Sequence, residues 1–157
     1  MGEVRSSISR IPDLLDQLDW LTDELEAQRP FLARMPDVQI KTSPLPELPS
    51  LLGMYYAMVA RERDIHLPSL GIKAASHLQD VPASDAWLDD LIIQLISMRS
   101  AIVDHLGRFT DDDWRAAPAG ASDHADVVTL AFEITQTDAD SLRAIAERMR
   151  EGQTALG

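Results

Sequence analysis

Residues 88–109, LDDLIIQLISMRSAIVDHLGRF, decide the fold class of this chain. Apolar side chains recur in this stretch at alternating steps of four and three residues, which is the spacing of one face of an α-helix. The members of that face are Leu88, Ile92, Leu95, Arg99, Ile102, Leu106 and Phe109. The pattern predicts a helix over 85–109 that carries one arginine inside an otherwise apolar face. No segment shows the alternation of every second residue that is typical of a half-buried strand.

Three further segments have the same helical spacing. The first runs over 12–34, the second over 47–66 after a proline-rich stretch, and the third begins after Ser122, which we expect to be its N-cap. Each apolar face again contains polar members. The faces are Leu14, Leu18, Leu21, Leu25, Gln28 and Leu32; then Leu51, Tyr55, Met58, Glu62 and Ile65; then Val127, Ala131, Ile134, Asp138, Ser141, Ile145 and Met149.

Four helices of this length are the parts of an all-α, four-helix bundle, and we predict one domain over residues 1–157. The connection LPSLGIKAASHLQDVPAS, residues 67–84, is far longer than an antiparallel turn needs. We therefore expect it to cross the length of the bundle, so that the second and third helices run parallel in an up-down-down-up order. A short helix with Thr110 as its cap is expected at Asp111–Asp113.

Composition limits the possible partners. The chain has 14 basic and 26 acidic residues and a net charge of -12, which repels phosphate backbones and anionic lipid head groups. It contains no cysteine, so disulfides and thiolate metal sites are excluded. No stretch approaches the length of a membrane span or of a signal-peptide apolar run. We expect a cytoplasmic protein that binds neither nucleic acid nor membrane.

The polar members of the four apolar faces are the candidate site. An arginine in a dry interior must be paired, so Arg99 should bind the carboxylate of Glu62 or Asp138. One interpretation is a buried ion pair that fixes helix register. The other is a polar pocket in which Arg99 binds the anionic group of a small molecule. The candidate ligand-binding residues are Arg99, Glu62, Asp138, Tyr55, Tyr56, Thr137 and Ser141, with Gln28 nearby.

Three stretches resemble the DinB/YfiT-like superfamily of bacterial four-helix bundles. They are LLGMYYAMVARERDIHLPSL at 51–70, LIIQLISMRSAIVDHLGRFTDDDW at 91–114 and ITQTDADSLRAIAERM at 134–149. The resemblance covers most of the chain. It rests on helix order, on the arginine-containing third helix followed by a tryptophan, and on the spacing in the last helix. It implies a four-helix bundle and a homodimer.

Many members of that superfamily hold a divalent metal with three histidines, one on the second helix and two on the fourth. The resemblance places Thr137 and Ser141 at the two positions of the fourth helix, and Tyr56 or Ala57 at the position of the second. None of these side chains replaces an imidazole as a ligand for zinc or nickel. The resemblance thus implies the fold without its metal, and we expect no metal or other cofactor.

The four histidines offer one further possibility. His66, His105 and His124 would lie toward the same end of an up-down-down-up bundle, while His77 falls in the long connection. Histidines near helix ends are common without any metal.

Three hypotheses for function follow. The first is a metal-free module that binds a small molecule or a protein. The second is a divalent-metal enzyme of the family type that uses other ligands for thiol transfer or hydrolysis. The third is a purely structural or regulatory partner protein.

Overall fold

The computed structural model describes residues 2–73, 87–120 and 122–156, and the side chains of residues 11–73, 87–120 and 122–151. This part of the chain is helical and contains no strand. The long helices are α1 (Gly2–Ala33), α3 (Leu51–Arg61), α5 (Leu88–Gly107) and α7 (Val127–Leu156). The short ones are α2 (Asp37–Lys41), α6 (Asp111–Arg115) and a continuation of α3 through a π-helical turn η1 (Glu62–His66) and α4 (Leu67–Ser69). None of these helices is both long and apolar enough to span a membrane.

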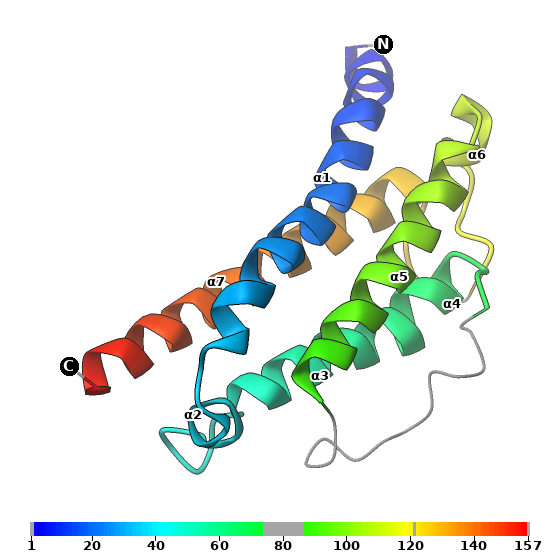
Figure 1. Ribbon diagram of the computed structural model, residues 1–157. Coiled ribbons are helices and arrows are strands. Elements are labelled where there is room, and N and C mark those ends of the chain that lie inside the picture. Colours follow the sequence, from blue (N-terminus) through cyan, green and yellow to red (C-terminus); the bar gives the residue numbers. More distant parts are fainter. Residues whose placement is uncertain (1, 74–86, 121, 157) are drawn as a thin grey trace.

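The four long helices pack in a closed ring of contacts. α1 packs on α5 and α7, and α3 packs on the same two helices from the other side. Figure 1 shows that α1 and α7 both run toward the lower left, whereas α3 and α5 run toward the upper right. The two helices joined by the long connection therefore run in the same general direction.

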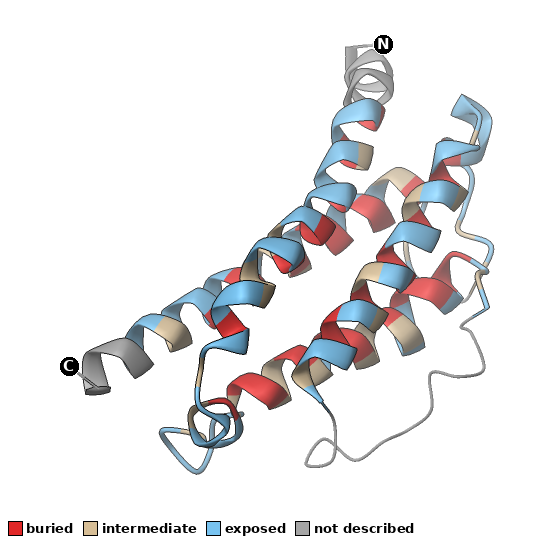
Figure 2. Ribbon diagram, viewed as in Figure 1, coloured by how far each residue is buried: buried red, intermediate tan, exposed pale blue. Residues whose placement is uncertain are grey.

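Each of the four long helices has one apolar face, and these faces point toward one another and form the core. Figure 2 shows the buried residues on the inward sides of the helices. Leu18, Leu21 and Leu25 of α1 are fully enclosed, as are Ile102 and Leu106 of α5. Burial of leucine and isoleucine side chains of this size stabilises a fold by about 1.5–3 kcal/mol each. The helical faces predicted from the sequence are thus the faces that make the core.

The predicted starts of the first and second helices were wrong. The first helix begins at Gly2 rather than Pro12, and both Pro12 and Pro30 lie inside it. The second begins at Leu51 rather than Glu47, because the hydroxyl of Ser50 accepts a hydrogen bond from the Gly53 N–H and caps the first turn. A capping serine satisfies an N–H group that the helix itself leaves unbonded.

The second helix also continues past its predicted end. Pro68 has no N–H to donate to the preceding turn, and the chain widens into the π-helical turn η1 before it reaches this proline. The extra residue in that turn changes which side chain faces inward. His66 is 7% exposed and Ile65 is 56% exposed, so the prediction that Ile65 belongs to the apolar face was wrong.

The fourth helix begins at Val127, and Ser122 is not its N-cap. The carboxylate of Asp126 accepts hydrogen bonds from the N–H and the hydroxyl of Thr129 instead. Ser122 lies in the preceding loop, where its hydroxyl contacts the His124 ring at 2.7 Å. The third helix is described from Leu88, and its predicted start at Asp85 lies outside the described residues.

The loop between α6 and α7 is fixed against the end of α4. Gly120 donates its N–H to the carbonyl of Ser69 at 3.0 Å, and a Cβ atom at this position would overlap the carbonyl oxygen of Pro68. The short helix α6 has the predicted cap, since Thr110 and Asp113 exchange side-chain to backbone hydrogen bonds. Its Trp114 is buried against Phe109, which closes this end of the core.

Candidate functional site

A buried polar centre joins all four long helical segments. Arg99 of α5 is 1% exposed, and its guanidinium reaches Glu62 of η1, Asp138 of α7 and the backbone of α1. Nε and Nη2 donate to the two oxygens of Glu62 at 2.8 and 3.1 Å. Nη1 and Nη2 donate to Asp138 at 2.5 and 3.0 Å, and Nη1 also donates to the Leu18 carbonyl at 3.1 Å. The prediction that Arg99 is paired with a carboxylate is confirmed, and both carboxylates take part.

All five N–H donors of Arg99 are used in these contacts, since an arginine side chain carries five. No buried side-chain nitrogen or oxygen of the described residues lacks a hydrogen-bond partner. The arrangement therefore satisfies the requirement that a buried charge be both paired and hydrogen-bonded. It offers an incoming anion no unbonded donor on Arg99.

His66 completes the buried polar centre, which we define as Glu62, His66, Arg99 and Asp138. Its Nδ1 lies 2.5 Å from the Glu62 carboxylate, one helical turn away, and the ring is largely buried. With a neutral imidazole the group carries one positive and two negative charges. One cation shared by two buried carboxylates need not offset the burial of each to the same extent.

The two carboxylates respond to this sharing in opposite ways. Burial raises the pKa of Glu62, but the charge of Arg99 and the hydrogen bonds from His66 and Arg99 more than offset it, and the pKa lies below its usual value. Burial also raises the pKa of Asp138, and here the hydrogen bonds and charge of Arg99 do not fully offset it, so the pKa lies above its usual value. Burial lowers the pKa of Arg99, yet the two carboxylates hold it above its ordinary value.

The other predicted site residues lie around this centre without joining it. Tyr55 of α3 is buried and donates its hydroxyl to the Gln28 side chain of α1 at 2.6 Å. Burial raises the pKa of this phenol, which keeps it a donor. Tyr56 is half-buried and packs on the edge of the core. The contact between Tyr55 and Gln28 gives the polar member of the first helical face a structural partner.

The positions that the resemblance assigns to metal ligands do not fit a divalent cation. The Thr137 hydroxyl donates to the Glu133 carbonyl of its own helix at 3.0 Å. The Ser141 hydroxyl accepts a hydrogen bond from the Arg61 guanidinium at 3.4 Å. A guanidinium beside this hydroxyl would repel a metal ion, and hydroxyl groups bind zinc or nickel poorly.

The histidines of the described residues do not form a metal site either. His66 is bound to Glu62, the His105 ring packs edge-on against Phe109, and His124 pairs with Glu133 through Nε2. Across the residues that the structure describes, no group of three histidine, aspartate or glutamate side chains is placed to hold a metal ion. His77 lies outside the described residues.

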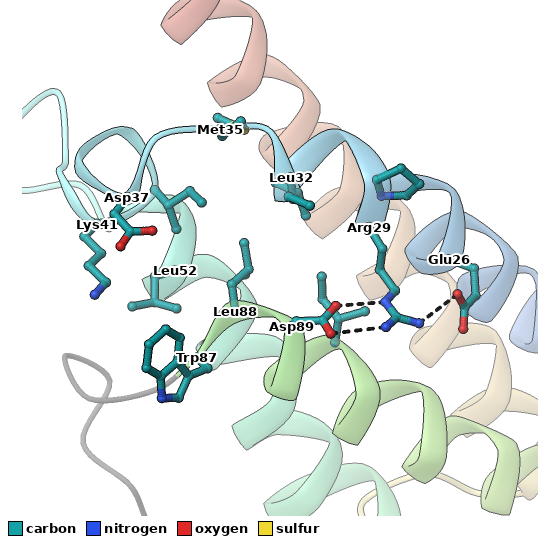
Figure 3. Close-up of a pocket in the computed structure, with 14 residues that line it drawn as sticks. Glu26, Arg29, Leu32, Met35, Asp37, Lys41, Leu52, Trp87, Leu88 and Asp89 are labelled. Atoms are coloured by element: carbon teal, nitrogen blue, oxygen red, sulfur yellow. Dashed lines mark hydrogen bonds and ion pairs between the residues drawn. The ribbon is translucent and has the colours of Figure 1, made fainter.

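A surface groove of about 630 Å³ lies between the end of α1, α2 and the first turns of α3 and α5. Figure 3 shows these elements surrounding the groove. Its floor is apolar and is made by the buried side chains of Leu32, Ile40, Leu52 and Ile92. A concave site of this volume with an apolar floor is typical of small-molecule sites.

Charged and aromatic side chains close the two ends of the groove. At one end, Arg29 of α1 makes a two-pronged contact with Asp89 of α5 at 2.8 and 3.1 Å, and it also binds Glu26 at 3.2 Å (Figure 3). At the other end, the Lys41 ammonium lies 5.9 Å from the centre of the Trp87 ring. Both contacts connect the α1–α2 side of the groove to the start of α5.

Sequence reasoning did not find this groove. No helix was predicted between residues 34 and 47, although Ile40 is an apolar residue within the polar stretch DVQIK and is buried. α2 packs on α3, and Ile40 belongs to the buried core and forms part of the groove floor. The exposed Trp87 at the start of α5 was the second available signal, since exposed tryptophan side chains often mark binding surfaces.

Comparisons of the chain with family models, with curated proteins and with solved structures found no match.

Proposed function

We propose that this chain is a metal-free helical module that binds a small, largely apolar molecule in the surface groove. The observation that carries the proposal is the groove itself, with its volume of about 630 Å³ and its floor of buried apolar side chains. Small-molecule sites commonly have volumes of about 300–1,000 Å³ and a few polar groups at the edge of an apolar surface. The saturated hydrogen bonds of Arg99 favour this groove over the buried polar centre as the place of binding.

The fold proposed for the module is a DinB/YfiT-like four-helix bundle in up-down-down-up order. The closed ring of contacts among α1, α5, α3 and α7 supports it, as do the helix directions in Figure 1. The role of Arg99 as the residue that joins the four helices is consistent with it. A homodimer and a cytoplasmic location belong to the same proposal. Size-exclusion chromatography with light scattering measures the mass of the protein in solution and tests the homodimer. Cell fractionation tests the location.

Fluorescence titration with phenylnaphthylamine, a neutral aromatic probe that brightens in apolar sites, tests binding in the groove. Trp87→Ala removes a wall of the groove, and Trp20→Ala removes the same side chain from the exposed surface of α1 outside the groove. The two tryptophans are 71% and 44% exposed, so neither substitution is expected to unfold the protein. We expect Trp87→Ala alone to weaken binding. Equal affinity in the two variants would contradict the proposal.

Elemental analysis of protein purified without a histidine tag tests the metal-free part of the proposal. We expect no stoichiometric zinc, nickel or manganese, and no shift of the melting temperature when these ions are added. A ligand that binds only the folded state raises its stability in proportion to the logarithm of the ligand concentration. One bound metal per chain would instead favour a metal-dependent enzyme that uses other ligands.

A further inference from the structure

The two cations that line the surface groove differ in their partners. The charge of Arg29 is matched by the carboxylates of Asp89 and Glu26, which both lie within hydrogen-bond distance. Lys41 has no carboxylate of the described residues within 4.0 Å, although Asp37 stands one helical turn before it in α2. Its contact is the face of the Trp87 ring. Among the described residues, Lys41 is therefore a groove cation that no acidic side chain pairs within 4.0 Å.

The Lys41 ammonium also has a defined position relative to the apolar floor. It extends from α2 toward Trp87, the residue that precedes α5, while Leu52 and Leu88 lie beside these two residues in Figure 3. A cation over an indole ring is held by the negative face of the ring, and Lys41 is exposed in the structure. Lys41 and Trp87 therefore place a positive charge at one end of an apolar surface.

We infer that the surface groove binds an organic anion, a carboxylate or sulfonate attached to an apolar or aromatic body, with the anionic group paired to Lys41. This inference rests on the proposed function and adds the class of the ligand. The apolar body would cover Leu52, Ile92 and their neighbours on the floor, and the anionic group would lie at the end marked by Trp87. At the other end, the carboxylates of Asp89 and Glu26 both bind the single Arg29 guanidinium, so this wall carries a negative charge in excess and offers an anion no open cation.

An anion fits this end of the groove better than a cation. Asp37 and Lys41 both line this end of the groove, but of these two it is the Lys41 ammonium that lies against the Trp87 ring, where an anionic group on an aromatic body can approach it without breaking that contact. The net charge of -12 opposes an anion at long range. At physiological ionic strength, however, the screening length is about 8 Å, so the charge nearest the bound anionic group, that of Lys41, has the largest effect, although Glu26, Asp37 and Asp89 also line the groove.

Two probes with the same aromatic body separate the charge from the apolar contact. Anilinonaphthalene sulfonate carries an anionic group, and phenylnaphthylamine is its neutral counterpart. Lys41→Met keeps a long side chain and removes the charge. Lys73→Met removes the same charge from an exposed lysine that does not line the groove, and it serves as the matched control.

We expect Lys41→Met to raise the dissociation constant of the sulfonate probe by up to about fivefold at low salt, because a single exposed ion pair contributes a modest amount to affinity. The neutral probe should bind equally to wild type and to Lys41→Met, and Lys73→Met should leave both probes unaffected. Added salt should weaken binding of the sulfonate to wild type and remove the difference between wild type and Lys41→Met.

Two results overturn the inference in distinguishable ways. Equal changes for both probes in Lys41→Met, or no change for either, would show that Lys41 does not select an anion, while the proposed apolar site would stand. Binding of neither probe, or binding that Trp87→Ala does not affect, would remove the proposed function and the inference together. Circular dichroism spectra of Lys41→Met, Lys73→Met and Trp87→Ala verify that each variant is folded, so that fluorescence of the sulfonate probe reports binding to folded protein.

Discussion

Arg99→Met tests whether the buried polar centre holds the four helices together. The substitution keeps a long side chain and removes the cation from Glu62 and Asp138, which are 1% and 5% exposed. Glu62 keeps His66 at 2.5 Å, but the hydrogen bonds found for the Asp138 carboxylate all come from Arg99. Asp138 must then take up a proton, which costs about 1.4 kcal/mol for each pH unit above its unfolded pKa, or about 4 kcal/mol near pH 7. Removal of one partner from a buried pair typically costs about 3–5 kcal/mol.

Urea denaturation followed by circular dichroism measures this loss. We expect Arg99→Met to lose about 4 kcal/mol near pH 7, out of a total of about 5–15 kcal/mol for a domain of ordinary stability. Near pH 5 the cost of protonating Asp138 falls to about 1–2 kcal/mol, so the variant should recover part of its stability relative to wild type. Arg61→Met is the control, since Arg61 is half-buried and makes one long contact with Ser141.

Double variants identify which carboxylate carries the cost. Arg99→Met with Asp138→Leu leaves Glu62 beside His66 and should recover most of the stability, because an apolar replacement of a buried ion pair is often neutral or better. Arg99→Met with Glu62→Leu leaves Asp138 alone and should recover less. A loss below about 1 kcal/mol in Arg99→Met, with no dependence on pH, would refute the reasoning that this network is costly to break.

Two further predictions concern pH and backbone packing. The pKa of Glu62 is lowered in the folded state, so the stability gained from its ionised form is complete above the unfolded value of 4.5 and is lost as pH falls through the folded pKa. The pKa of Asp138 is raised, so its contribution is retained below the unfolded value of 3.8 and declines as pH rises through the folded pKa. In urea titrations at several pH values, the stability difference between wild type and Glu62→Gln should therefore grow with rising pH, and that between wild type and Asp138→Asn should fall; slopes of the same sign would contradict these assignments. Gly120→Ala should cost about 1–3 kcal/mol or more, because its Cβ would overlap backbone atoms of Pro68. Gly107→Ala, which meets nothing within 4 Å, should be neutral or stabilising, and equal melting temperatures in the two glycine variants would argue against the close packing of the loop.

The parts of the fold that could be predicted are those governed by helical periodicity. Leu18, Leu95 and Ile134 are buried where the spacing placed them, because apolar burial over several turns outweighs local preferences. Arg99 was predicted to pair with Glu62 or Asp138 for the same reason, since a charge on a core face has to find a partner there. The number of partners was not predictable, because it depends on how the backbone of α1 approaches Arg99.

The errors lie where local geometry depends on a tertiary contact. Ile65 and His66 differ by one position, and the π-helical turn decides which of them faces the core. Ser122 is a typical capping residue, yet Asp126 takes that role because the loop before it is held against α4 through Gly120. The groove was missed because its floor combines residues of α1, α2, α3 and α5 that share no sequence pattern.

Under the proposed function, the buried polar centre contributes to stability and the surface groove to recognition, so the two roles belong to different parts of the molecule. An anion that reached Arg99 would have to replace Glu62 or Asp138, and each replacement would leave a buried carboxylate without its cation. The cost of about 3–5 kcal/mol corresponds to a loss of affinity of about two to three and a half orders of magnitude, which a small ligand rarely recovers from new contacts. Lys41 can pair with an anion while its contact with Trp87 stays in place, and the buried side chains below are already packed. The free-energy difference between these two routes is the physical reason to expect ligands at the groove.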